Sequence, residues 1–189
     1  MGITMIRAAF TMLLTLTVVT GILYPLAITG IAKVLFPAQA AGSLIVEGGK
    51  VKGSELIGQS FEEPKYFWSR LSATGPFPYN AASSSGSNYG PHNADLKKAP
   101  AARRAALQAA DPQNQTSPPI DLITASASGL DPHISPEAAA YQAARVARVR
   151  NLPIEKINQL IGAHTTGRPL GFLGEPTVNV LMLNRALDR

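Results

Sequence analysis

The residues with the most chemical potential lie in one window, Thr124–His133, which reads TASASGLDPH. Its small hydroxyl residues follow an apolar run and precede a helix start, where backbone amides and hydroxyls can hold an anion. Asp121, Asp131 and His133 could form an acid–base set here, although a triad would also need a placed nucleophile. The alternative is a loop whose hydroxyl groups bond to their own backbone.

Other catalytic and metal-binding patterns are absent from the sequence. The chain has no cysteine, which excludes disulfides, iron–sulfur clusters, thiolate zinc sites and cysteine nucleophiles. His92, His133 and His164 have no spacing typical of a metal pair, and no Walker loop, G-x-S-x-G or H-E-x-x-H motif occurs. We therefore expect no catalytic residue and no metal site.

The net charge of +5 could indicate an acidic partner such as nucleic acid or anionic lipid. No aromatic ladder or nucleic-acid-binding motif accompanies this charge. We expect a mildly basic surface and no nucleic-acid partner. The basic residues are scattered, with two local groups: Lys97, Lys98, Arg103 and Arg104, and then Arg145, Arg148 and Arg150.

A long apolar stretch near the N-terminus is the element that must position the rest of the chain relative to a membrane. It runs uncharged from Ala8 to Ala32, between Arg7 and Lys33, and is long enough to cross a bilayer as a helix. Ala38-Gln39-Ala40 resembles a signal-peptidase site, but the apolar region of a signal peptide spans only about 7–15 residues. We expect an uncleaved single-pass anchor in the lipid bilayer, with a secreted domain as the alternative.

Three residues inside this stretch are typical of a helix packed against a partner. Gly21 and Gly30 permit close approach of another helix, and Pro25 removes one backbone hydrogen bond. Ordinary single spans also contain such residues. Arg7 and the N-terminal amine favour a cytoplasmic N-terminus, whereas Lys33 opposes it. We expect the N-terminus inside and the domain outside the cytoplasm.

The sequence predicts an α+β fold: one N-terminal transmembrane helix followed by a single mixed α/β soluble domain with long loops. We expect a tail and transmembrane helix at 1–36, a linker at 37–42, and an extracytoplasmic domain at 43–189. The last segment has a common single-domain size.

Local patterns predict the elements of that domain. Two strands should flank Gly48-Gly49, and 120–124 reads as a short strand. Residues 178–187 suit either a strand or a helix, and we favour a helix. The aromatic stretch 61–68 indicates the core or a partner contact. Helices are expected from Asn93 through Leu107 despite Pro100, from a Ser135 cap to about Arg150, and from Pro153 to about Gly162.

Ten strings along the chain together resemble one family, the C subunit of the bacterial Kdp potassium-transporting ATPase (KdpC). The chain departs from the family's usual pattern at three positions: Leu71 stands where the family has proline, and Ser85 and Ala127 stand where it has glycine. The matching strings are GQSF (58–61), YFWSR (66–70), SAT (72–74), PYN (78–80), GSN (86–88), DLITAS (121–126), SGLDPHISP (128–136), RVAR (145–148), GFLGEP (171–176) and VNVL (178–181).

The resemblance implies a non-catalytic accessory subunit of an ATP-driven, high-affinity potassium uptake complex in the bacterial inner membrane. The implied partners are a channel-like potassium-binding subunit and a P-type ATPase subunit that hydrolyses ATP. The C subunit would serve assembly and stability, and could gate or line the outer ion entrance. Asp121 and Asp131 are candidates there, because acidic residues raise the local cation concentration.

The resemblance also implies an alternative role as a catalytic chaperone that raises the ATP affinity of the ATPase subunit. Its nucleotide-binding residues would be Ser126, Ser128, Gly129 and Gln142. Ala127 weakens this reading, and a domain outside the cytoplasm would not meet cytoplasmic ATP. We therefore expect no intrinsic cofactor, with ATP reached only through the partner subunit. A membrane-tethered binding domain is a further alternative.

Overall fold

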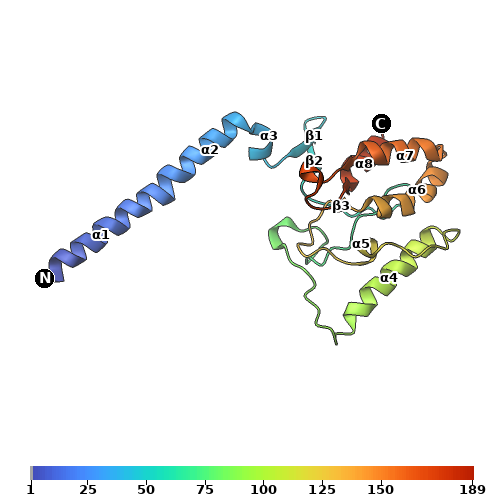
Figure 1. Ribbon diagram of the computed structural model, residues 1–189, viewed down its shortest axis with the longest axis horizontal. Helices are drawn as coiled ribbons and strands as arrows, with labels where there is room; N and C mark the ends of the chain where they lie inside the picture. The colour runs from blue at the N-terminus through green and yellow to red at the C-terminus, as the bar shows by residue number, and fades with distance from the viewer. Residues whose placement is uncertain (1) are drawn as a thin grey trace. The chain divides into compact units, whose positions relative to one another are not determined.

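The computed structural model describes residues 2–189 and divides the chain into two compact units, Met1–Lys52 and Gly53–Arg189 (Figure 1). The first unit begins with a continuous helix made of α1 (Gly2–Val18), the π-helical turn η1 (Val19–Leu23) and α2 (Tyr24–Leu35). This 34-residue helix is apolar and long enough to cross a membrane, and its apolar window has no buried residue.

The wide turn η1 has a local cause in the sequence. The Tyr24 N–H donates to the Val19 carbonyl, five residues back. Pro25 follows immediately, carries no N–H and crowds the preceding turn. A local π-turn is one way in which a membrane helix accommodates such a proline.

Beyond this helix, α3 (Pro37–Ala40) forms a single turn and leads into the hairpin of β1 (Leu44–Glu47) and β2 (Lys50–Ser54). Gly48 and Gly49 have φ of 57° and 75°, the left-handed pair that a tight two-residue hairpin turn requires. The predicted strand–glycine turn–strand is confirmed.

The second unit combines helices with a small antiparallel sheet, which confirms the predicted α+β class. The sheet has the order β3 (His133–Ile134), β5 (Thr177–Asn179), β4 (Thr165–Thr166), with Ile134 and Thr165 both opposite Val178. The helices are α4 (Asp95–Ala110), α5 (Ile120–Ile123), α6 (Pro136–Arg150), α7 (Ile154–Ala163) and α8 (Val180–Leu187), with 3₁₀ turns η2 (Ala81–Ser83) and η3 (Pro169–Gly171).

The core lies where α6, α7 and α8 pack on one another and on β5. Phe67, Val146, Ile157, Val178 and Leu183 are fully buried there. The predicted helix starts are confirmed: the Ser135 hydroxyl accepts from the Ala138 N–H at 3.0 Å and caps α6. Likewise, the Asn93 side chain accepts from the Asp95 N–H at 2.8 Å at the start of α4.

One element prediction is wrong and one is partly right. Residues 120–123 form the helical turn α5 instead of a strand. Two consecutive residues of this turn, Leu122 and Ile123, are both buried. A strand would turn them to opposite faces. Residues 178–187 contain both a strand and a helix. Strand β5 ends at Asn179, and the Asn179 side chain accepts from the Met182 N–H at 3.1 Å and caps the start of α8.

Candidate functional site

The aromatic segment, residues 61–71, runs through the domain without regular secondary structure, and side chains complete its backbone hydrogen bonds. The Asn184 amide accepts from the Phe67 N–H at 2.8 Å and donates to the Phe67 carbonyl at 2.9 Å. The Gln142 amide does the same for Trp68, at 2.7 and 3.1 Å. Two side-chain amides therefore pair with this segment as a neighbouring strand would.

Hydrogen bonds within the fold take up the whole hydrogen-bonding capacity of the Gln142 side chain. It is 1% exposed, and its Nε2 also donates to the Ala138 carbonyl at 3.2 Å. Its Oε1 also accepts from Arg145 Nη2 at 2.8 Å. An amide has two donors and two acceptor sites, so no capacity is left over.

Arginines hold the same segment from two helices. Arg145, from α6, donates to the carbonyls of Pro64 and Tyr66, and Arg103, from α4, donates to the Ser69 carbonyl at 2.7 Å. Both guanidinium groups lie about 5 Å from the Trp68 ring centre, at 5.1 and 4.8 Å. Burial lowers the pKa of Arg145 to about 10, and no carboxylate of residues 2–189 lies within ion-pair distance of it.

The window highlighted by the sequence forms half of a loop junction, defined as residues 72–86 against 126–131. The Ser72 hydroxyl donates to the Gly129 carbonyl at 2.7 Å, and the Ser85 N–H donates to the Ser128 carbonyl at 3.0 Å. Gly129 has a φ of 69°, and a Cβ there would lie 2.5 Å from Thr74 Cγ2. Glycine is required at this position because of both its conformation and the close approach.

The four residues of the nucleotide hypothesis divide between two places. Ser126, Ser128 and Gly129 lie together in the junction, where the Ser126 N–H donates to the Leu71 carbonyl and the Ser128 hydroxyl accepts from the Leu130 N–H. Gln142 lies beneath the aromatic segment and bonds to Trp68 instead. These bonds fit the loop alternative, and nucleotide contact at these residues stays a prediction.

The two acidic candidates have separate local bonds. Asp131 pairs with Arg70 at 3.0 Å and accepts from the His133 N–H at 3.0 Å. Burial opposes its ionisation, but hydrogen bonds from His133 and Arg70 outweigh this and hold the pKa of Asp131 below its ordinary value. Asp121 instead accepts from the Ser135 N–H at 2.7 Å, next to the start of α6. The structure thus brings Asp131 and His133 together and gives Asp121 a different partner.

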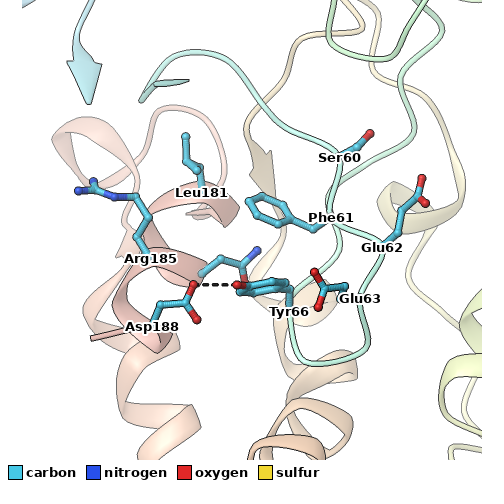
Figure 2. A pocket seen from close by; sticks show the side chains of 9 residues that line it. Ser60, Phe61, Glu62, Glu63, Tyr66, Leu181, Arg185 and Asp188 are labelled. Atoms are coloured by element: carbon cyan, nitrogen blue, oxygen red, sulfur yellow. Dashed lines mark hydrogen bonds between the residues drawn. The ribbon is translucent and has the colours of Figure 1, made fainter. Parts of the chain in front are cut away.

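A cavity of about 260 Å³ opens beside the aromatic segment, between Phe61, Tyr66 and α8 (Figure 2). Two of its three carboxylates have partners: Asp188 accepts from the Tyr66 hydroxyl at 2.8 Å and pairs with Arg150 at 2.7 Å, and Glu63 pairs with Lys65 at 2.8 Å. Across residues 2–189 no group of three or more acidic, histidine or cysteine side chains could hold a metal ion.

The sequence reasoning missed the roles of Asn184 and Arg145. A signal was available, because Gln142 and Arg145 lie three residues apart within an alanine-rich helix, and Asn184 interrupts an apolar one. Polar residues on the buried face of a helix need partners. The partners themselves lie 74 to 117 residues away along the chain.

Comparison with known proteins gives this architecture a family. Residues 6–189 match the family model described as KdpC, the K⁺-transporting ATPase c chain. Potassium-transporting ATPase KdpC subunits are 61% identical in Ralstonia nicotianae, over 97% of this chain and 90% of the relative, and 59% identical in Herpetosiphon aurantiacus, over 98% and 96%. That of Polaromonas naphthalenivorans is 61% identical over 97% and 93%. The chain therefore belongs to the KdpC family of potassium-transporting ATPase subunits.

Proposed function

We propose that this chain is a non-catalytic subunit that stabilises the potassium pump by docking. The long apolar helix would pack on membrane helices of the channel-like and P-type ATPase subunits, and the domain would lie outside the cytoplasm near the outer ion entrance. The observation that carries this proposal is the helix Gly2–Leu35, which is uncharged from Ala8 to Ala32 and has no buried residue in its apolar window. In the membrane, only lipid or a partner can cover it.

The glycines of this helix support a protein partner. A Cβ at Gly30 would meet no atom within 4 Å, and one at Gly21 would meet only Thr17 Cγ2, at 4.0 Å. Glycine costs a helix interior about 1 kcal/mol relative to alanine. The described chain offers no steric reason for either glycine, whereas close approach of a second helix does.

The region around Pro25 supports the same role. Pro25 supplies no N–H, and the wide turn η1 before it shifts the hydrogen-bond register. Carbonyls left without a backbone donor are costly in hydrocarbon, so such turns favour a polar contact from a neighbouring helix.

The domain's polar groups support a structural role instead of ATP handling. Gln142 has no free hydrogen-bonding capacity, and the hydroxyls of Ser72 and Ser128 in the loop junction bond within the fold. We therefore assign ATP binding to the P-type subunit. Because Arg70 neutralises Asp131, we also propose that any effect of this carboxylate on potassium at the entrance is weak.

Single-cysteine labelling tests the topology, because the natural chain has no cysteine. Asn158 is exposed on α7, so Asn158→Cys should react with a membrane-impermeant maleimide added to spheroplasts, whereas Ile3→Cys should react only after permeabilisation. The reverse pattern would place the domain in the cytoplasm and revive the chaperone role. Docking itself predicts that the full-length chain co-purifies in detergent with both larger subunits, and purification of the chain alone would contradict it.

A further inference from the structure

Residues 168–175, here called the Phe172 loop, present large apolar side chains to solvent. Leu170 is 81% exposed, Phe172 70% and Leu173 48%. Elsewhere in residues 53–189, exposed large apolar side chains are more isolated, as with Leu56 and Ile120. Scattered apolar side chains are normal on a surface, but three within four residues mark an interaction site.

The loop is held in one conformation by its own backbone and by an ion pair. Arg168 and Glu175 pair at 2.6 Å across its base. Within it, the Gly171 N–H donates to the Arg168 carbonyl and the Leu173 N–H to the Pro169 carbonyl, both at 3.0 Å. Leu170 has a φ of 54°, a left-handed conformation that few non-glycine residues adopt. The apolar tip is therefore preformed.

The charges of the loop favour a protein partner over a lipid surface. Between Gly167 and Pro176 the only charged residues are Arg168 and Glu175, which neutralise each other. A loop that binds anionic lipid gains from additional basic residues, and this one has none. A fixed aromatic side chain inside a polar rim is instead the arrangement found at the centre of protein interfaces.

We propose that the Phe172 loop is an anchor that inserts into an apolar pocket of another subunit of the same pump. Phe172 fills the pocket, Leu170 and Leu173 seal its edge, and the Arg168–Glu175 pair forms the polar rim. This inference rests on the proposed docking function, and names the part of the domain that carries out the docking.

Competition for assembly tests the anchor. Two full-length copies, one wild type and one Phe172→Ala, are given different tags and expressed with the partner subunits, and their ratio in the purified complex is measured. Loss of a central aromatic anchor weakens binding by about 30-fold or more, so the variant should be depleted to a similar degree. The matched control is Ile120→Ala, which truncates an equally exposed apolar side chain and should be incorporated like wild type.

Equal incorporation of Phe172→Ala and wild type would overturn the anchor. If the wild-type chain itself fails to assemble with the partners, the docking function is wrong, which separates the two failures. Misfolding is checked by thermal unfolding of the full-length variant in detergent, which should match wild type because Phe172 is exposed.

A second variant separates a protein pocket from lipid. Phe172→Trp in the assembled complex, reconstituted with brominated lipids, should show blue-shifted emission that the bromines do not quench. The buried Trp68 is the only tryptophan of this chain, and the same complex assembled with the wild-type chain gives the background. Strong quenching of the added tryptophan would show that the loop lies in the bilayer, and would overturn the protein pocket.

Discussion

The aromatic segment and the exposed apolar surfaces of the chain differ in whether contacts within the chain cover or satisfy their chemical groups. In the aromatic segment, Gln142, Asn184 and Arg145 satisfy backbone groups that no strand pairs. On the apolar helix and the Phe172 loop, large apolar side chains stay exposed. The first region is complete within the chain, whereas the second is completed only by lipid or another protein.

This difference separates residues that make the fold from residues that make the complex. The family resemblance implies nucleotide binding at Gln142 and Gly129, yet their contacts account for both residues within the domain. Gly21, Gly30 and Phe172 have no such account in the structure. Changes in the first group should therefore alter the stability of the chain alone, and changes in the second only its assembly.

The largest effect on the chain alone is expected from Arg145→Ala. It leaves the carbonyls of Pro64 and Tyr66 without a donor, removes the guanidinium over Trp68 and opens a cavity. We expect the free energy of unfolding to fall by about 4 kcal/mol. Urea unfolding of the full-length chain in detergent, followed by Trp68 fluorescence, measures it. Arg104→Ala, on the exposed side of α4, is the control, and a similarly small effect at both positions would break the comparison.

A smaller loss, about 3 kcal/mol, is expected from Gln142→Leu, because it leaves the buried N–H and carbonyl of Trp68 unpaired. The same unfolding measurement applies, with the exposed Gln159→Leu as the matched control. ATPase assays of the assembled pump sharpen the result. If Gln142→Leu left stability intact but raised the KM for ATP, the nucleotide role would hold and the structural assignment would be wrong.

Asp131→Asn should give the smallest loss, with a defined pH dependence. The folded pKa of Asp131 is lowered, so its ionised form stabilises the fold above its ordinary pKa, and this contribution disappears as the pH falls through the folded value. We expect a difference from wild type of about 1.5 kcal/mol at pH 7 that shrinks below about pH 4. Asp95→Asn, at an exposed ion pair, is the control. A difference independent of pH would contradict the assignment.

Local chemistry made part of the fold predictable. Ser135-Pro136-Glu137 specifies a helix start through its cap and fixed φ, and Gly48-Gly49 specifies a hairpin turn. Residues 120–123 were not predictable in the same way. A short apolar run fits a strand or a buried helical turn equally well, and the packing that decides between them comes from elsewhere in the chain.

The candidate site was predictable only in outline. The sequence highlights the window that contains Gly129, but not the facing loop with Ser72 and Thr74, because that contact joins residues 57 apart. The family resemblance singles out Gln142, whereas the sequence places its hydrogen-bond partner Trp68 in a separate aromatic cluster. Only the folded arrangement of α6 against the aromatic segment brings them together.

The incorporation of Gly30→Leu tests the central claim most directly. A Cβ at position 30 meets no atom of the described chain within 4 Å, so the unfolding of the domain should match wild type. In competition for the partner subunits, however, the variant should be depleted by about tenfold or more, a loss of about 1.4 kcal/mol of docking energy. Gly2→Leu, the same change at the helix start, should be incorporated like wild type. Equal incorporation of Gly30→Leu and wild type would contradict the claim that this helix docks on a partner.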